Sequence, residues 1–88
     1  MSSSVTSASA ATLADAVVKL LVEKYEAPAE TMTVDTEFEA LGFDSLILVE
    51  VAVDLSRRYD IEVADDELQE AGTAARTAEL LAAKGAVA

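Results

Sequence analysis

The chain has 88 residues, a formal net charge of −11, and neither His nor Cys. This length suits one small domain with a small hydrophobic core. The negative charge repels phosphate backbones and anionic lipids, so we expect no binding to nucleic acids or membranes, and we expect partners that carry basic patches. The lack of His and Cys excludes disulfides and most zinc, iron–sulfur and thiol chemistry. Any thiol that this protein uses must come from another molecule.

Residues 1–11 are rich in Ser and Ala and are predicted to form a disordered tail. They lack the basic start and apolar centre of a signal peptide, and no apolar run in the sequence is long enough to span a bilayer. We therefore expect a cytoplasmic protein. Residues 12–84 are expected to form one domain, and residues 85–88 a frayed C-terminus. Because the chain starts with Met and ends soon after the last predicted helix, we expect a free-standing protein, with an excised domain of a larger protein as the alternative. We also expect a monomer.

The composition favours an all-α fold, because there are only three Gly and one Pro, while Ala and Leu are abundant. The first helix is predicted at about residues 13–25, with Thr12 as its cap. A second helix is predicted at about residues 45–59 and a short third helix at about 65–70. A fourth helix, capped by Thr73, ends near residue 83. These elements predict a small four-helix bundle, with three longer helices and one short one.

The connection between the first two helices is long, and long loops are usually functional or partly structured. Phe38 and Leu41 lie three residues apart, and Gly42 is a typical helix stop. We predict a short helical turn here, with Asp35 as a possible cap, that attaches the loop to the core.

The second helix carries two apolar faces at 100° per residue. The predicted core face holds Leu48, Val51, Ala52, Leu55 and Tyr59. The nearly opposite face holds Leu46, Val49 and Val53, with Glu50 and Arg57 beside them. A bundle of this size cannot bury both sides of one helix. The second face is therefore either a docking surface that stays exposed in the isolated domain, or part of a wider core, or simply tolerated on the surface.

The start of this helix places one serine in a distinctive position. Asp44 is predicted to cap the helix, and Phe43 and Leu48 have the spacing of a hydrophobic staple. Ser45 then becomes the first helical residue, beside free backbone amides and the positive end of the helix dipole, where a phosphate ester is favoured. The alternative is that Asp44 and Ser45 only start the helix. A catalytic serine would need a base such as His, which the chain lacks, so we expect no catalytic residues.

The stretch LGFDSLILVEVAVDLSRRYDIEV resembles the central motif of acyl carrier proteins, in which Asp-Ser-Leu follows a Leu-Gly pair and opens the second helix. The segments DTEFEALG before it and YDIEVADDEL after it are also similar to the family, and Thr73 matches the threonine before the last helix. The resemblance covers roughly residues 13–81. It implies a non-catalytic carrier whose serine bears a 4′-phosphopantetheine arm derived from coenzyme A, on which acyl groups are held as thioesters.

The resemblance also implies roles for single residues. Ser45 matches the attachment serine, and Asp44 matches the aspartate that the phosphopantetheinyl transferase recognises. The remaining positions match the family's partner-recognition surface: Leu46, Val49, Glu50 and Val53, to which we add Arg57. Arg57 and Arg58 alternatively complement the negative end of the helix. The implied partners are the transferase and the acyltransferase, ketosynthase or acyl/aminoacyl ligase of the pathway.

The motif GFDSL resembles polyketide-type carriers more than peptidyl carriers. Ile47 and Leu48 stand where fatty-acid carriers usually have polar residues. We therefore expect a polyketide or mixed polyketide–peptide secondary-metabolism carrier, with a peptidyl, aminoacyl or fatty-acid-synthesis carrier as the alternative. A further hypothesis places the acyl group between the helices, near Leu48, Phe38 and Ile61. An unmodified acidic helical adaptor remains the alternative of another class. We expect no metal site, since the acids of VADDELQE lack the loop of a calcium site.

Overall fold

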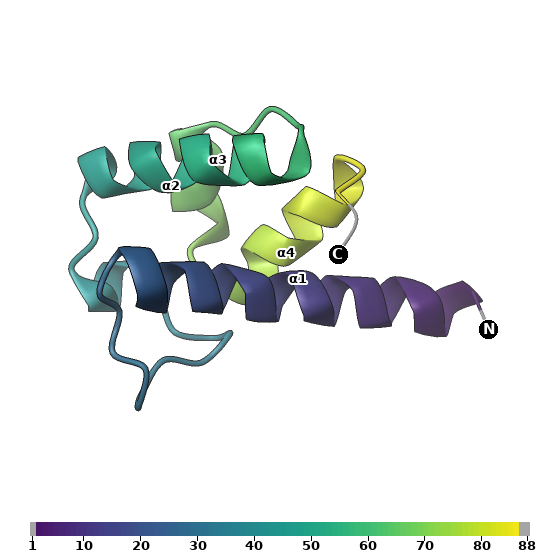
Figure 1. The fold of residues 1–88 in the computed structure, drawn as a ribbon, viewed down its shortest axis with the longest axis horizontal. Coiled ribbons are helices and arrows are strands. Elements are labelled where there is room, and N and C mark those ends of the chain that lie inside the picture. Colours follow the sequence, from purple (N-terminus) through teal and green to yellow (C-terminus); the bar gives the residue numbers. More distant parts are fainter. Residues whose placement is uncertain (1, 87–88) are drawn as a thin grey trace.

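The computed structural model describes residues 2–86, which form four α-helices and one short 3-10 helix (Figure 1). In chain order, the elements are α1 (Ser2–Lys24), η1 (Glu39–Leu41), α2 (Ser45–Tyr59), α3 (Asp65–Ala71) and α4 (Ala74–Ala83). Helices α1 and α2 run in opposite directions, α4 lies against α1, and α3 packs against both α2 and α4. No β-strand occurs in residues 2–86. The predicted all-α bundle with a short third helix is confirmed.

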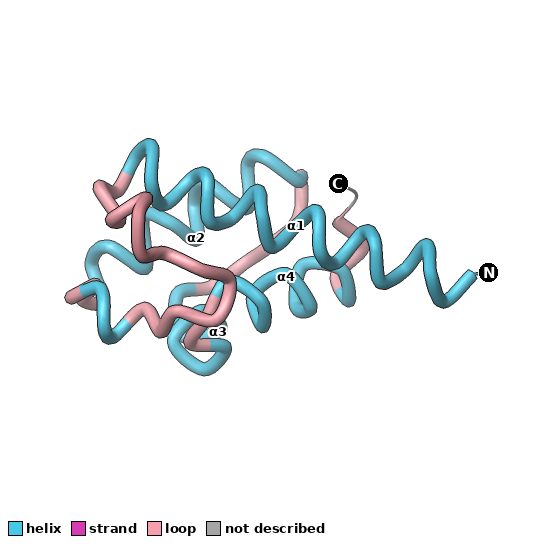
Figure 2. Tube along the Cα trace, turned by 90° about the horizontal axis from the view of Figure 1, so that it is seen from below, coloured by secondary structure: helices cyan, strands magenta, loops and turns pink. Residues whose placement is uncertain are grey.

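Helix α1 begins earlier than the sequence indicated. It starts at Ser2, so Thr12 lies inside the helix and does not cap it, and the predicted tail is helical over residues 2–11. The physical reason is that the segment is rich in Ala and contains no Gly or Pro before Pro28, so no residue stops the helix there. The N-terminal half of α1 extends beyond the other helices (Figures 1 and 2). The boundaries of the domain itself stay a prediction.

The core lies between the inner faces of the helices. The inner face of α1 is buried, since Leu13, Val17 and Leu21 are each at most 1% exposed. Leu55 from α2, Leu68 from α3 and Leu81 from α4 are equally buried. Thr77 is the buried polar residue of α4, and its hydroxyl donates to the backbone oxygen of Thr73 at 2.7 Å. Thr73 caps α4 as predicted, because its side chain accepts from the Arg76 amide at 3.2 Å.

The long loop between α1 and α2 is attached to the junction of α3 and α4. The Phe38 amide donates to the Gly72 oxygen at 2.8 Å, and the Ala75 amide donates to the Val34 oxygen at 2.9 Å. Phe38 itself is 3% exposed, and Gly42 ends η1 in the left-handed conformation at φ 76°. The predicted helical turn and its Gly42 stop are therefore confirmed.

Asp35 does not cap this turn, so that prediction is wrong. The N-cap residue of η1 is Phe38, three residues further on, without a side-chain cap. The Asp35 amide instead donates to the Thr33 hydroxyl at 3.2 Å. The turn is held by the burial of Phe38, and therefore needs no carboxylate cap.

The loop between α2 and α3 is short, and side chains hold it and the start of α3 in place. The Ser56 hydroxyl accepts from the Val63 amide at 3.0 Å and donates to the Ala52 oxygen at 2.8 Å, which ties the α2–α3 loop to α2. Glu67 accepts from the Ala64 amide at 3.0 Å and forms an ion pair with Lys84 at 3.0 Å. The start of α3 is thus linked to the end of α4.

The C-terminal end differs in part from the predicted frayed segment. Gly85 adopts φ 96°, and the Ala86 amide donates to the Leu81 oxygen at 2.9 Å. Ala86 is 8% exposed, so this residue packs on the core and closes α4. Residues 87–88 of the predicted frayed end lie outside the described part of the chain. Among the helices of residues 2–86, none is both long and apolar enough to cross a membrane.

Candidate functional site

The start of α2 has the geometry that the sequence predicts. Asp44 is the N-cap with extended backbone angles, and its Oδ1 accepts from the Ile47 amide at 3.0 Å. Ser45 is the first residue of α2, and its side chain is exposed. Within the described residues, no hydrogen bond occupies the Ser45 hydroxyl. The hydroxyl is therefore accessible from solvent.

The electrostatic setting of Ser45 suits a phosphate ester. The first amides of an α-helix have no acceptor inside the helix, and the helix dipole places partial positive charge at this end. Asp44 satisfies one of these amides, that of Ile47, and leaves the helix start open to a second acceptor. Ser45 thus combines an accessible hydroxyl with a position that favours an anion, so the residues present fit a phosphodiester at this place.

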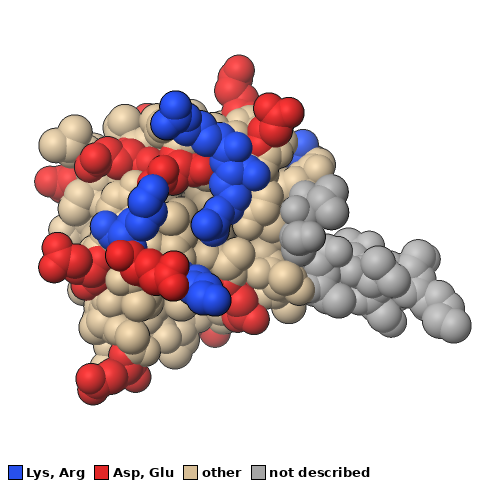
Figure 3. Space-filling model, viewed as in Figure 1, with Lys and Arg blue, Asp and Glu red and all other residues tan. Residues whose placement is uncertain are grey.

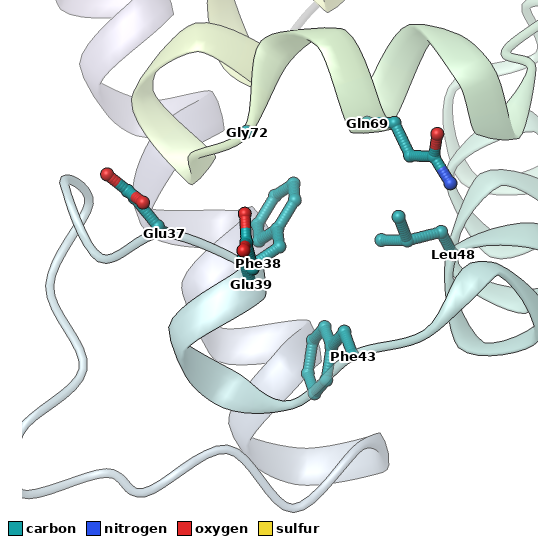
Figure 4. Close-up of a pocket in the computed structure, with 7 residues that line it drawn as sticks. All are labelled: Glu37, Phe38, Glu39, Phe43, Leu48, Gln69 and Gly72. Atoms are coloured by element: carbon teal, nitrogen blue, oxygen red, sulfur yellow. The ribbon is translucent and has the colours of Figure 1, made fainter.

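A cavity of about 320 Å³ lies beside the start of α2 (Figure 4). It is lined by residues of the long loop, α2 and the end of α3: Glu37, Phe38, Glu39, Phe43, Leu48, Gln69 and Gly72. The rings of Phe38 and Phe43 stack with centroids 6.4 Å apart. The predicted staple pair, Phe43 and Leu48, lines the same cavity. Ile61, which was expected near the stored acyl group, does not line it, and acyl storage stays a prediction.

The two predicted faces of α2 are separated as expected. Leu48, Val51, Ala52 and Leu55 are buried, while Tyr59 is half-buried. On the other face Leu46, Val49 and Val53 are 68%, 41% and 50% exposed, and they are the large exposed hydrophobic residues of the described chain. The reading in which this face is part of a wider core is therefore wrong. We call Leu46, Val49 and Val53 the α2 stripe.

Charged residues border the α2 stripe. Glu50 and Arg57 are exposed, as the sequence predicts, and Glu50 forms no ion pair among the described residues. Figure 3 shows the face that α1 and α2 present. Acidic and basic side chains lie next to one another there, and uncharged surface surrounds these charged groups. Lys24 and Lys84 form ion pairs with Asp54 and Glu67, which the sequence did not indicate.

One contact between α1 and α2 was not predicted. The Tyr25 hydroxyl donates to Asp54 Oδ2 at 2.5 Å, and Lys24 Nζ lies 3.3 Å from Asp54 Oδ1. Burial, and then the hydrogen bond to Asp54, raise the pKa of Tyr25 well above its usual range. The same hydrogen bond holds the pKa of Asp54 below its usual value. Both groups therefore keep the protonation states that the hydrogen bond needs at neutral pH.

The described residues contain no group of three or more His, Cys, Asp or Glu side chains placed to hold a metal ion. The acidic segment that begins α3 is used differently. Glu67 caps the helix and pairs with Lys84, while Asp66 and Glu70 are exposed. These carboxylates form a charged surface on α3.

The comparisons with known proteins agree with this geometry. Residues 15–81 match the family described as "Phosphopantetheine attachment site". The protein named "Acyl carrier protein 1, chloroplastic" from Spinacia oleracea is 34% identical over 68 residues, which are 76% of this chain and 49% of that protein. The "Acyl carrier protein" of Sulfurovum sp. (strain NBC37-1) is 36% identical over 62 residues, which are 69% of this chain and 83% of that protein. No solved structure matches the chain.

The chain belongs to the acyl carrier protein family. Its cofactor is a covalently attached 4′-phosphopantetheine. The resemblance found in the sequence is therefore confirmed, and an unmodified adaptor is set aside. The chain spans about half the length of the spinach relative, and 39% of "Acyl carrier protein SF2, chloroplastic" from Brassica campestris, to which it is 36% identical over 52 residues.

Proposed function

We propose that Ser45 is the residue to which the 4′-phosphopantetheine is attached, and that the chain holds acyl intermediates for other enzymes without catalysing their reactions. The observation that carries this proposal is an exposed serine hydroxyl, free of hydrogen bonds in the described chain, at the first position of α2. Its neighbours form the sequence GFDSL, which resembles the attachment motif of the family.

The residues at the start of α2 have different roles in the attachment of the phosphopantetheine arm. In the transfer, the Ser45 oxygen bonds to the phosphorus of coenzyme A next to the pantetheine, the bond to the adenosine bisphosphate group breaks, and the serine proton goes to a base of the transferase. Asp44 holds the helix start in shape through the Ile47 amide. The helix amides favour the phosphodiester that results. When bound, the arm supplies the thiol that this chain lacks, and acyl groups are held on it as thioesters.

The α2 stripe and Glu50 are proposed to bind the partner enzymes. The stripe is apolar and exposed, and Ser45 lies at the N-terminal end of the same helix. A partner that binds here faces the arm, and tethering raises the effective concentration of the acyl group at its active site. The proposed partners are a phosphopantetheinyl transferase and an acyltransferase, ketosynthase or ligase. The net charge of −11 favours basic surfaces on all of them.

The proposed pathway is polyketide or mixed polyketide–peptide secondary metabolism. It is supported by the GFDSL sequence and by Leu48, a buried apolar residue where fatty-acid carriers usually have a polar one. Similarity to proteins named acyl carrier proteins favours acyl over aminoacyl cargo. A fatty-acid-synthesis carrier is the second candidate. Transfer assays with the loaded and acylated chain separate the two. Polyketide-synthase enzymes should accept the acyl group from this chain, and transfer only to fatty-acid enzymes would contradict the polyketide proposal.

The attachment site is tested by intact mass spectrometry after incubation with coenzyme A, Mg²⁺ and a broad-specificity phosphopantetheinyl transferase. The wild type should gain one phosphopantetheine. Ser45→Ala should gain none, because it lacks the attacking oxygen, while its helical circular dichroism and thermal midpoint stay close to those of the wild type. Ser56→Ala is the matched control, since Ser56 lies on the same helix with its hydroxyl bonded to backbone, and it should still be loaded. Loading of Ser45→Ala would contradict the proposal.

A further inference from the structure

The cavity beside the start of α2 combines an apolar wall with two acidic side chains (Figure 4). Phe38 and Leu48 belong to the apolar wall and are 3% and 4% exposed. Glu37 and Glu39 line the same cavity and are exposed. None of the described residues that line it is Lys or Arg. No role for the two acids was predicted from the sequence, and the proposed function leaves them unused.

The two acids have no partner of opposite charge. Neither Glu37 nor Glu39 forms an ion pair or a side-chain hydrogen bond within the described chain. The backbone between them is fixed, because the Phe38 amide donates to the Gly72 oxygen at 2.8 Å. The carboxylates are therefore held beside the cavity, and no cation of this chain neutralises them.

A third negative charge inside this cavity is unfavourable. A carboxylate that leaves water for an apolar site loses its hydration, and here no lining cation replaces the water. Glu37 and Glu39 also repel it, and the repulsion is stronger where water is partly excluded. A neutral acyl group meets neither cost, and its burial against Phe38 and Leu48 is favourable. The cavity therefore distinguishes acyl groups by their charge.

The size and lining of the cavity suit a short acyl group with an additional oxygen. Its volume is about 320 Å³. For comparison, roughly 150 Å³ is enough for one benzene in an apolar cavity. Gln69 lines the cavity from α3 (Figure 4), and its side chain forms no hydrogen bond within the described residues. Its amide can donate to a keto oxygen without adding a charge.

The cavity lies next to the proposed attachment site. Phe43 and Leu48 both line it, and they flank Ser45 closely in the sequence, one on each side. An acyl group on an arm at Ser45 therefore reaches the cavity when the arm folds back onto the chain.

We propose that Glu37 and Glu39 make this cavity selective, so that it takes neutral acyl groups and leaves acyl groups that end in a carboxylate in water. A β-keto acyl group enters, with its keto oxygen accepting from Gln69, while a malonyl group stays at the surface. A malonyl group outside the cavity remains open to a partner enzyme, whereas an enclosed ketide is protected from water. This inference rests on the proposed attachment to Ser45, and it adds two residues that determine which cargo is sheltered.

Two acyl groups of nearly the same shape test the selectivity, because acetoacetyl has a methyl group where malonyl has a carboxylate oxygen. The isotope-labelled apo chain is loaded from acetoacetyl- or malonyl-coenzyme A by a broad-specificity phosphopantetheinyl transferase with Mg²⁺, and intact mass confirms each cargo. Relative to the chain with a free thiol arm, acetoacetyl should shift the backbone amide resonances of Phe38 and Leu48. Malonyl should shift them at least about 5-fold less, because charge repulsion keeps it out of the cavity.

Substitution of the two acids tests whether they cause this difference. In Glu37→Gln/Glu39→Gln, malonyl should shift the same amide resonances at least about twice as far as in the wild type, because two repelling charges are gone. The matched control is Glu62→Gln/Glu79→Gln, which removes two exposed acids that do not line the cavity. The control should keep the small malonyl shifts of the wild type.

The hydrogen bond to Gln69 has its own measurement. Gln69→Met removes the donor and should reduce the shifts caused by acetoacetyl about twofold, because one hydrogen bond to the cargo is lost. Butyryl has no keto oxygen, so its shifts should stay unchanged in this variant. Equal reductions for both acyl groups would remove Gln69 from the proposal.

Three results would overturn the selectivity and leave attachment to Ser45 standing. These are equal shifts for acetoacetyl and malonyl, no shifts for either, and malonyl shifts in Glu37→Gln/Glu39→Gln that equal those of the wild type. A wild type that is never loaded would overturn the proposed function as well.

Discussion

At the scale of single residues, Tyr25 and Asp54 link the end of α1 to the middle of α2. The two residues are 29 positions apart in the chain, and the link consists of one hydrogen bond supported by Lys24. The pKa of Tyr25 is raised by burial and by Asp54, and the pKa of Asp54 is lowered, first of all by the Tyr25 hydrogen bond. Each shift reports that folding favours the neutral phenol and the ionised carboxylate.

These shifts predict how stability depends on pH. The raised pKa of Tyr25 contributes stability that is complete below pH 10.0, its ordinary pKa, and that is lost as pH rises further. The lowered pKa of Asp54 contributes stability that is complete above 3.8, its ordinary pKa, and that is lost as pH falls further. Tyr25→Phe should therefore cost about 1 kcal/mol of unfolding free energy between these limits, and less outside them. Urea denaturation across this pH range measures the difference.

A double-mutant cycle with Asp54→Asn separates the hydrogen bond from other effects of the substitution. If the bond is the cause, the double variant should lose less than the sum of the two single variants at pH 7. If the losses of unfolding free energy are purely additive, the stability change comes from packing. The same conclusion follows if the stability difference between Tyr25→Phe and the wild type stays constant across the pH range.

Residue roles were predictable from the sequence where the interaction is local. Asp44 caps the amide of Ile47, three residues away, and Ser45 follows from that cap. The Ser56 hydroxyl, in contrast, bonds to Val63, seven residues away across a loop, and Tyr25 reaches Asp54 across two helices. No spacing rule indicates such partners, because they depend on how the elements pack.

At the scale of elements, α2 divides its apolar residues between two opposite faces. One face packs into the core with residues such as Val51, which is 1% exposed, while the α2 stripe stays in water. Apolar side chains that stay in water contribute no stabilisation from burial, so the α2 stripe is slightly unfavourable for the isolated fold. Its exposure is consistent with use in binding.

A matched set of charge substitutions on α2 tests this division. Val49→Asp and Val53→Asp should each change the unfolding free energy by less than about 0.5 kcal/mol, because both side chains already face water. Val51→Asp places the same carboxylate in the core, and should cost about 3 kcal/mol or more. Thermal or urea denaturation measures the stability of each variant. Loading by the transferase measures partner binding, which should be weaker for Val49→Asp and Val53→Asp than for the wild type. Severe destabilisation by Val49→Asp would place that residue in the core.

The elements themselves were predictable to different degrees. The bounds of α2 and α4 followed from apolar periodicity bordered by caps at Asp44 and Thr73. The start of α1 did not, because several Ser before residue 12 could each cap a helix and no Gly or Pro stops one there, so the sequence does not single out where the helix begins. The cap expected at Asp35 failed because burial of Phe38 positions the turn instead.

At the scale of the whole molecule, acidic charge is largely uncompensated. The chain has 17 acidic and 6 basic residues, and the described residues contain two ion pairs, Lys24–Asp54 and Lys84–Glu67. The remaining carboxylates repel one another across a small surface, which destabilises the compact state. The same charge would attract basic surfaces on the proposed partner enzymes, so the property proposed to favour docking also lowers the stability of the free carrier.

Salt should therefore stabilise this fold. Raising NaCl from about 0.02 to 0.5 M shortens the screening length to a few Å and should raise the thermal midpoint by several degrees. Glu30→Lys changes an exposed, unpaired acid and should raise the midpoint at low salt but not at high salt. Calorimetry in NaCl and in choline chloride separates screening from binding of one particular cation, since screening predicts equal gains. A midpoint that falls with salt, or a Glu30→Lys gain that persists at 0.5 M, would mean that charge repulsion does not limit the stability of this carrier.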